Sequence, residues 1–451
     1  MNKNDTAVVT IIDMNQDGEG IGKVEGYTLF IKDTVIGDVA EVKVIKAKKN
    51  YGYARLMKLI APSDKRVTPR CPVARQCGGC QLQAYAYEEQ LLFKQNKVKN
   101  NLERLGKISG YELMSVIGMD EPWHYRNKAQ FPVGKDKAGN IITGFYAGRT
   151  HSIIENDDCI LGVEENKQIL SIVKEFMKEY KIEPYNEEQH SGLVRHVLIR
   201  KGYHTGDIMV CLVINGKKLP HAERLTERLR ELSGMKSITI STNEEKTNVI
   251  LGKEVCTLWG EPVIEDRIGE VTFEISPLSF FQVNPIQTEK LYGKALEYAR
   301  LTGNEIVWDL YCGIGTISLF LAQRAKKVYG VEIVPAAIEN AKRNAQKNGF
   351  TNTEFFVGKA EEVLPAWYEK HKERADVIVV DPPRKGCDET LLRTMVEMQP
   401  ERIVYVSCDS ATLARDLGIL SQYGYQTECV QPVDMFPQTV SVENVALLTR
   451  R

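Results

Sequence analysis

Apolar and polar positions follow different patterns in three successive stretches of the chain. Residues 6–60 hold short apolar runs with polar, glycine-rich segments between them, which predicts five short strands: AVVTIIDM, DGEGIGKVEG, YTLFIK, AEVKVIKA and YARLMKLI. Four glycines mark tight turns or bulges, because a residue without Cβ can adopt a positive φ: Gly18, Gly20, Gly22 and Gly26. Five short strands make a small β-barrel, so we expect one over residues 1–62.

The middle stretch, residues 63–270, mixes two periodicities. Between Glu88 and Leu105 apolar side chains recur at helical spacing, and Gly106 is well placed to end the helix. The segments VRHVLIRKG and GDIMVCLVING alternate as strands do, with polar connectors around them. We therefore expect a mixed α/β central domain.

In residues 271–451, buried apolar strands alternate with segments that suit helices. The strand segments are EIVWDL, KKVYGVEI, TEFFVG, ADVIVVD and RIVYVS. This alternation predicts a parallel sheet with helices on both faces, a doubly wound Rossmann-like domain. The clearest helix runs from Pro335 to Asn348, with Pro335 in its first turn and Gly349 at its end. The chain as a whole is predicted to be α/β.

Composition narrows the class of protein. With 451 residues, 43% of them hydrophobic and 26% charged, the chain is long enough for two or three globular domains and is not of the disordered or fibrous class. Residues 1–20 show no signal-peptide pattern and no later stretch is apolar enough for a membrane span, so we expect a cytoplasmic protein. Ten cysteines are too sparse for a disulfide scaffold, and individual thiols therefore need an explanation through metal binding or a reaction.

The charge of the chain is nearly balanced overall but not locally. The formal net charge is −1. Residues 41–70 nevertheless contain nine Lys or Arg against Glu41 and Asp64, a local excess of seven. Clustering of this kind suits a phosphate backbone. A solvated surface explains such a run equally well.

Acidic and glycine residues at predicted strand ends indicate a cofactor site. DLYCGIG follows the strand IVWDL, and its Asp309, Tyr311, Gly313 and Gly315 form a tight turn where backbone can approach a ligand. A third glycine at dinucleotide spacing is missing, so the nicotinamide fingerprint is incomplete. Glu332 ends the next strand, where a carboxylate can accept both hydroxyls of a ribose. The segment Asp-x-x-x-Gly-x-Gly resembles motif I of the S-adenosylmethionine methyltransferases.

A third strand-end motif is DPPR, Asp381 to Arg384, after ADVIVV. Methyltransferases that act on amino groups place Tyr or Phe after the two prolines, to stack on an extruded base. This chain has Arg384 at that position. Methylation of an exocyclic amine is thereby disfavoured.

A thiol and a carboxylate complete the predicted site. Cys408 ends the strand RIVYVS, and Glu443 begins the last strand, which should run antiparallel beside it. C5 of uracil becomes nucleophilic when a thiolate adds to C6, and a base must later remove the C5 proton. We expect Cys408 to be the nucleophile and Glu443 the base. The thiolate should be favoured by its position at a strand end and by nearby positive charge, with Arg384 as one candidate.

Four other cysteines have the spacing of a metal site. Cys71, Cys77 and Cys80 form C-x5-C-x2-C, and Cys159 follows far downstream. Four thiolates could hold zinc or an iron–sulfur cluster. The spacing does not decide between these two and thiols without a metal.

Together these motifs carry a resemblance to a known family. Residues from Gly18 to Pro72 look like a TRAM domain, an OB-like RNA-binding module. FFQVN, DLYCGIG, DPPRKG, SCDSATLARD and SVENVALL are similar to the RNA 5-methyluridine (uracil-C5) methyltransferases. The TRAM domain and the cysteine pattern resemble the 23S ribosomal RNA branch in particular.

The resemblance implies an activity and a set of site residues. It implies transfer of a methyl group from S-adenosylmethionine to C5 of a uridine in 23S rRNA, through a covalent bond between Cys408 and C6, with Glu443 as the base. It implies a pocket for cofactor and base lined by Gln282, Tyr311, Glu332 and Asp381, besides the glycines of the tight turn. It also implies a [4Fe-4S] cluster on the four spaced cysteines. The expected partner is RNA, neither DNA nor a membrane, and we expect a monomer.

Three alternatives stay open at this stage. The tRNA members of the family share the catalytic third but usually lack the TRAM domain and the cysteine pattern. A non-catalytic RNA-binding iron–sulfur protein could keep a degenerate methyltransferase fold, although the intact Cys408 and Glu443 argue against it. Cytosine C5 methylation uses the same thiol chemistry. No residue indicates which uridine of 23S rRNA is the target.

Overall fold

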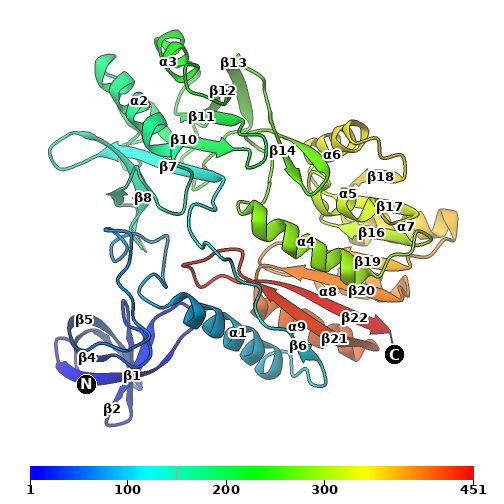
Figure 1. Ribbon diagram of the computed structural model, residues 1–451, viewed down its shortest axis with the longest axis horizontal. Helices are drawn as coiled ribbons and strands as arrows, with labels where there is room; N and C mark the ends of the chain where they lie inside the picture. The colour runs from blue at the N-terminus through cyan, green and yellow to red at the C-terminus, as the bar shows by residue number, and fades with distance from the viewer. Residues whose placement is uncertain (149, 451) are drawn as a thin grey trace. The chain divides into compact units, whose positions relative to one another are not determined.

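The computed structural model describes residues 1–148 and 150–450 (Figure 1). Contacts within this part of the chain divide it into two compact units, and both are discontinuous in sequence. The first unit comprises Met1–Lys97, Phe145–Ile154 and Phe436–Ser441, and the second comprises Val98–Gly144, Glu155–Met435 and Val442–Arg451. The described helices include none with the length and apolar character needed to cross a membrane.

The first unit contains a closed barrel with the strand order β1-β2-β3-β5-β4. Its strands are β1 (Thr6–Met14), β2 (Gly20–Val24), β3 (Tyr27–Ile31), β4 (Val39–Ala47) and β5 (Tyr51–Ala61). Successive side chains of a strand point to opposite faces, so alternate residues enter the interior. Apolar side chains fill it: Val9, Ile11, Leu29, Ile31, Ala40, Val42, Val44, Ala54 and Leu56. The predicted barrel is confirmed.

Segments far apart in sequence complete the first unit. The helix α1 (Tyr87–Arg104), predicted from its apolar stripe, begins here. The Gln90 amide donates to Gln438 Oε1 at 3.0 Å and accepts from the Gln438 backbone N–H at 3.0 Å. The backbone N–H groups of Gln81 and Leu82 both donate to the Gln438 carbonyl, at 3.1 and 3.0 Å. Residues near the carboxyl end of the chain thus bind the segment that follows the barrel.

A seven-stranded sheet, most of it in the second unit, has the order β13-β12-β11-β10-β7-β8-β9. Its strands are β7 (Lys128–Lys135), β8 (Ile141–Tyr146), β9 (Ile153–Glu155), β10 (Val194–Lys201), β11 (Ile208–Ile214), β12 (Met235–Thr242) and β13 (Glu254–Gly260). The accompanying helices are α2 (Glu165–Glu179) and α3 (Ala222–Leu229). Every residue of β11 is buried, as its continuous apolar sequence requires. The predicted mixed α/β character of this region is confirmed.

The rest of the second unit is built on an eight-stranded sheet with the order β18-β17-β16-β19-β20-β22-β21-β6. Its strands are β6 (Glu112–Leu113), β16 (Ile306–Leu310), β17 (Lys327–Glu332), β18 (Thr353–Val357), β19 (Val377–Val380), β20 (Arg402–Ser407), β21 (Tyr425–Val433) and β22 (Glu443–Arg450). A hairpin of β14 (Ile264–Ile268) and β15 (Val271–Ile275) precedes them. The domain boundary predicted at residues 270 and 271 lies in the turn of this hairpin.

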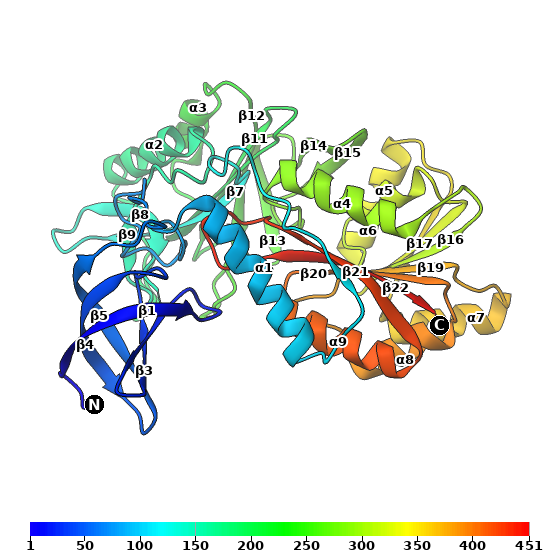
Figure 2. The same ribbon diagram turned by 60° about the horizontal axis from the view of Figure 1, so that its bottom comes forward.

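Helices cover both faces of the eight-stranded sheet (Figure 2). They are α4 (Pro285–Ala299), α5 (Thr316–Ala322), α6 (Pro335–Lys347), α7 (Ala360–His371), α8 (Glu389–Glu397) and α9 (Ser410–Gln422). Strands β16 to β20 are parallel, whereas β22 runs antiparallel to β20. The chain proceeds from β16 to β17 and β18 on one side, and then returns to place β19 and β20 on the other. Ligands of doubly wound sheets bind at such a reversal, beyond the carboxyl ends of the strands.

Candidate active site

The turn after β16 has the backbone geometry of a close approach to a ligand. Tyr311, Gly313 and Gly315 have φ values of 68°, 54° and 84°. A tyrosine rarely adopts a positive φ, so the backbone of this turn is strained at Tyr311. Its backbone is held to the next strand, because the N–H groups of Tyr311 and Cys312 both donate to the Val331 carbonyl, at 3.0 and 3.1 Å.

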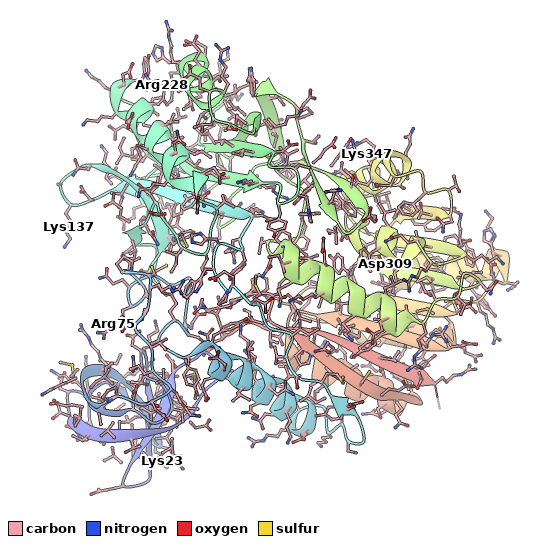
Figure 3. The ribbon with its side chains drawn as sticks, viewed as in Figure 1. Lys23, Arg75, Lys137, Arg228, Asp309 and Lys347 are labelled. Carbon is pink, nitrogen blue, oxygen red and sulfur yellow. The ribbon has the colours of Figure 1, made fainter. Side chains whose placement is uncertain are left out.

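Asp309 lies beneath this turn, near the end of β16 (Figure 3). Its side chain is fully buried, and burial raises the pKa of the carboxyl to about 7, with the charge of Asp381 adding to the rise. One carboxylate oxygen accepts from the Ser318 hydroxyl, and the other has no hydrogen-bond partner in the described part of the protein. A buried acceptor without a partner costs free energy, so Asp309 is prepared for a donor that a ligand supplies.

Glu332 is the last residue of β17. Its side chain connects the end of this strand to the turn after β16. Its carboxylate accepts from the Gly313 N–H at 3.3 Å and from the Val334 N–H at 3.0 Å. The two residues after it, Ile333 and Val334, expose 58% and 49% of their surface although both are aliphatic. An acidic group beside an exposed apolar surface is suited to a ribose that carries a flat, weakly polar base.

The segment Phe280–Asn284 approaches the same strand ends from the start of α4. Asn284 caps this helix by accepting from the Gln287 N–H at 3.2 Å, and its amide donates to the Met435 carbonyl at 3.0 Å. Gln282 is buried, whereas Phe280 is 70% exposed to solvent. The buried amide of Gln282 and the exposed ring of Phe280 thus belong to one segment that Asn284 caps.

Tyr292 of α4 connects this segment to the acidic groups. Its hydroxyl lies 3.2 Å from the Thr316 hydroxyl at the start of α5 and also hydrogen-bonds Gln282. Burial raises the pKa of this phenol, and the neighbouring charge of Asp381 raises it further. The hydroxyl therefore stays protonated at neutral pH and lies within hydrogen-bonding reach of both Gln282 and Thr316.

The loop after β19 carries Asp381 and Arg384. Burial raises the pKa of Asp381 to about 7. The loop is anchored from α9 by Asp416, whose carboxylate accepts from the Cys387 N–H at 2.8 Å and from the Tyr405 hydroxyl. Arg415 completes the anchor by donating to the carbonyls of Lys385 and Cys387, at 3.0 and 2.9 Å. These bonds fix the position of Asp381 relative to β20.

Cys408 and Glu443 face each other across two antiparallel strands. The pairing of β20 with β22 includes Ser407 opposite Asn444, so the next position places Cys408 opposite Glu443. Glu443 is 4% exposed, and Cys408 is half-buried. The separation of 35 residues along the chain is closed by the register of the sheet alone.

Burial, and not positive charge, controls the protonation of this pair. It raises the pKa of Glu443 to about 8, an effect that Asp381 strengthens and Arg384 opposes. It also raises the pKa of Cys408 to about 12, and Glu443 and Asp381 add to this rise while Arg384 again opposes it. The sequence correctly predicts Arg384 as the nearby cation. The expectation that the site favours the thiolate does not hold for the protein alone, because two carboxyl groups and burial outweigh one guanidinium.

Comparison with known proteins decides the family. A family model described as tRNA (Uracil-5-)-methyltransferase matches residues 86–451, and a TRAM domain model matches residues 3–57. The chain belongs to the RNA uracil-5-methyltransferase family. It is therefore an S-adenosylmethionine-dependent RNA methyltransferase with an RNA-binding TRAM domain.

Individual relatives cover the whole chain. An uncharacterized RNA methyltransferase of Halalkalibacterium halodurans is 55% identical, over 99% of this chain and 98% of its own length. Another from Clostridium tetani is 52% identical, over 99% and 97%. The crystal structure of a Pyrococcus abyssi tRNA (uracil-54, C5)-methyltransferase with S-adenosyl-L-homocysteine is 30% identical, covers 98% of this chain and 99% of its own, and has a TM-score of 0.80.

The residues at the strand ends suit the methyl donor of the family. The unpartnered oxygen of Asp309, the backbone turn at Gly313 and Gly315, and Glu332 beside exposed Ile333 fit the polar and flat parts of an adenosine. S-Adenosylmethionine supplies an electrophilic methyl group when it is bound. Asp309, Ile333 and Tyr292 are absent from the site residues predicted from sequence, although Asp309 stands in the predicted turn.

The predicted iron–sulfur site is not supported by the arrangement of its residues. Cys71, Cys77 and Cys80 lie in the first unit. Cys77 accepts a hydrogen bond from the Gly79 N–H at 3.3 Å, and burial followed by the charge of Cys71 raises its pKa. Across the described residues, no three His, Cys, Asp or Glu side chains gather as a group able to hold a metal ion. C-x5-C-x2-C spacing alone therefore does not establish a metal centre here.

Proposed function

We propose that this enzyme methylates C5 of a uridine in 23S ribosomal RNA, with Cys408 as the nucleophile and Glu443 as the base. The observation that supports this proposal is the register of β20 and β22, which pairs Ser407 with Asn444, the residues adjacent to Cys408 and Glu443, while the charge of Glu443 acts on Cys408. Asp381, whose charge acts on both of them, links the pair to the cofactor side of the site. A thiol and a carboxyl group are the two functional groups that uracil C5 methylation requires.

The sequence of bond changes assigns one task to each residue. The Cys408 thiolate adds to C6 of the extruded uridine, and the electron pair of the C5–C6 bond moves into the enolate. C5 would then take the methyl group of bound S-adenosylmethionine, whose S–CH3 bond would break to leave S-adenosylhomocysteine. The Glu443 carboxylate removes the proton from C5, and the C6–S bond breaks as the double bond returns. Gln282 and the Tyr292 hydroxyl hold and orient the base beside Asp381.

Proton release from Cys408 must accompany substrate binding. In the protein alone burial keeps the pKa of the thiol at about 12, so little thiolate is present at neutral pH. Glu443 and Asp381 are the charges that add to this rise, and a bound sulfonium cation would counter them and favour the thiolate.

The substrate class has two candidates, ribosomal and transfer RNA. The resemblance to the ribosomal branch rests on the TRAM domain and on the cysteine spacing. However, the Pyrococcus abyssi tRNA enzyme aligns with 98% of this chain, which includes the region of the barrel. A barrel at the front of the chain is therefore common to both substrate classes. Transfer RNA uracil C5 methylation is the second candidate function.

Mapping of 5-methyluridine in a deletion strain tests the substrate. We expect a methylated uridine to disappear from 23S rRNA and to return when the gene is restored, while tRNA stays unchanged. Loss confined to tRNA would replace the first candidate by the second. The Cys408→Ala variant should not restore the modification, because it lacks the nucleophile.

Purified variants test the chemical roles. Cys408→Ala should lower methyl transfer by at least about 10³-fold, since it removes the covalent step. Glu443→Gln should transfer the methyl group but retain a covalent RNA adduct, visible as a slowly migrating band in a denaturing gel. Cys256→Ala is the matched control, because Cys256 is an exposed thiol on β13. Normal transfer by Cys408→Ala would exclude the proposed mechanism.

We also keep the [4Fe-4S] cluster as a proposal that rests on cysteine spacing and family resemblance. Anaerobic purification followed by iron and sulfide analysis tests it. The expected content is about four of each per chain, and it should fall in Cys77→Ser but not in Cys256→Ser. Absence of iron and sulfide from the anaerobically purified protein would reject the cluster.

A further inference from the structure

The outer face of the barrel carries three aromatic rings in mutual contact. Phe30 of β3 and Tyr51 and Tyr53 of β5 have ring centroids 5.9, 5.6 and 6.0 Å apart. The strands β3 and β5 pair in parallel, with Phe30 opposite Tyr53. Leu29 and Ile31, on either side of Phe30, are fully buried in the barrel, so Phe30 points outward. We call Phe30, Tyr51 and Tyr53 the aromatic platform.

The aromatic platform is not explained by packing within the barrel. Tyr51 is 39% exposed, and Phe30 and Tyr53 are each half-buried although they lie outside the core. The hydroxyl groups of Tyr51 and Tyr53 form no hydrogen bond within the described part of the chain. By contrast, the hydroxyl of the neighbouring Tyr27 donates to the Lys48 carbonyl at 2.8 Å and so serves the barrel itself. Exposed rings of this kind provide apolar surface for a partner with flat faces.

Positive charges flank the aromatic platform on the adjoining strands. On β4, Lys46 pairs with Tyr53 and Lys43 pairs with Arg55. On the other side, Lys23 of β2, labelled in Figure 3, is paired with Thr28 of β3. Within the described residues these four cations, Lys23, Lys43, Lys46 and Arg55, form no ion pair. Glu41, two residues before Lys43 on β4, is the acidic group on the same strand.

Charge and shape together select one kind of partner. A surface of unpaired cations attracts a polyanion, and exposed rings between them attract flat, apolar faces. Unpaired nucleotides combine both properties, whereas the bases of a duplex are stacked within the helix and cannot reach the rings. We propose that the aromatic platform stacks with unpaired bases of the RNA substrate, while Lys23, Lys43, Lys46 and Arg55 bind the adjoining phosphates. The inference rests on the proposed function only in taking RNA as the substrate.

The first experiment measures RNA binding by the full-length protein. Fluorescence anisotropy is recorded with an unstructured 12-nucleotide RNA and with a duplex of the same length. Tyr51→Ala and Phe30→Ala should each weaken single-strand binding roughly 5- to 100-fold, the usual contribution of one stacked base. Tyr51→Phe keeps the ring and should bind as the wild type does. Duplex binding should be unchanged in all three variants.

The matched control and the salt dependence separate stacking from charge. Met57, on β5 as well, is 53% exposed, and Met57→Ala should leave binding unchanged. The logarithm of the binding constant is plotted against the logarithm of the salt concentration. The slope should equal that of the wild type in Tyr51→Ala and should be less steep by about 0.7 in Lys46→Gln. Melting curves verify the fold of each variant, and the pair Tyr51→Ala and Tyr51→Phe suffices if Phe30→Ala is unstable.

The outcomes separate this inference from the proposed function. Single-strand binding by folded Tyr51→Ala within twofold of the wild type would overturn the aromatic platform. So would an equal loss on single strand and duplex, because that result indicates a general electrostatic effect. Weakened single-strand binding, together with 23S rRNA that keeps all its 5-methyluridine in the deletion strain, would leave the platform intact and reject only the proposed substrate.

Discussion

Cys408 and Glu443 are held in a setting that keeps both groups protonated in the protein alone. Burial and the nearby Asp381 raise the pKa values of the two residues to about 12 and about 8. In the proposed function Asp381 also takes part in orienting the substrate. Strongly raised pKa values of this kind are common among groups of active sites.

Glu443→Gln should make the protein more stable at alkaline pH. A carboxyl whose pKa is raised from 4.5 to about 8 on folding stabilises the native state fully below its unfolded pKa, and this contribution is lost as pH rises through about 8. The neutral amide avoids the loss. Between pH 5 and pH 8.5 the difference in unfolding free energy between the variant and the wild type should shift in favour of the variant by about 3–4 kcal/mol.

Thermal unfolding at pH 5 and pH 8.5 measures this effect. Glu397→Gln, an exposed residue at the end of α8, is the control and should shift Tm equally at both pH values. If Glu443→Gln behaves as this control does, Glu443 is not the buried carboxyl with a raised pKa that the structure shows.

At the residue level, the sequence predicts groups that lie at strand ends better than those that lie on helices. Glu332, Asp381 and Cys408 end strands of one parallel sheet, and alternation along the chain is enough to bring them to one edge. Tyr292 was not predicted, because its place depends on how α4 packs, and an apolar stripe does not distinguish a buried tyrosine from an ordinary core residue. The protonation of Cys408 depends on burial, which sequence does not reveal.

Among the elements, α9 holds the loop after β19 in place. Asp416 and Arg415 bind that loop at the Cys387 N–H and at two carbonyls. Gly386 has a φ of 74°, and a Cβ there would lie 2.6 Å from Asp416 Oδ2, so the loop passes directly over this carboxylate. The helix therefore positions Asp381 through a set of hydrogen bonds that does not include Asp381.

Asp416→Asn should loosen this loop. The amide would direct a donor at the Tyr405 hydroxyl or at the Cys387 N–H, and Arg415 would lose its charged partner. We expect a loss of about 2–3 kcal/mol in the free energy of unfolding, measured in urea, since buried hydrogen bonds to charged groups contribute in this range. We also expect kcat to fall more than the affinity for the methyl donor, because Asp381 and Arg384 are displaced from Cys408.

The control for this prediction is another carboxylate close in sequence to the same loop. Glu389 on α8 is exposed and pairs with Arg393 at 2.7 Å. Glu389→Gln should change stability by less than about 0.5 kcal/mol, as exposed ion pairs contribute little. Equal effects of the two substitutions would contradict the anchoring role of Asp416.

At the scale of the whole molecule, local periodicity predicts the barrel and both sheets, but not the composition of the first unit. That unit includes Phe145–Ile154, which contains the end of β8 and the start of β9, and the segment Phe436–Ser441. Phe436–Ser441 is part of the first unit because of long-range backbone hydrogen bonds, such as those that Gln81 and Leu82 donate to the Gln438 carbonyl. No pattern within Phe436–Ser441 indicates a partner some 350 residues away, so the sequence could not predict it.

Hydrogen exchange should reveal this dependence. In the full-length protein the amides of Gln81 and Leu82 are bonded to Gln438 and should exchange slowly. In a fragment of residues 1–97 they should exchange rapidly, because the acceptor is missing. The amides of Leu29 and Ile31, inside the closed barrel, should stay protected in both. Slow exchange of Gln81 and Leu82 in the fragment would show that the segment folds without Gln438.

The discontinuity of the first unit also has a consequence for the order of events during synthesis. A ribosome builds the chain from the amino end, so Phe436–Ser441 is made after almost all of the second unit. Glu443 follows two residues after that segment. The segment that completes the first unit and the proposed base are thus made one directly after the other. A nascent chain can form the barrel early, yet under the proposed function it gains its base only after almost all of the second unit has been made.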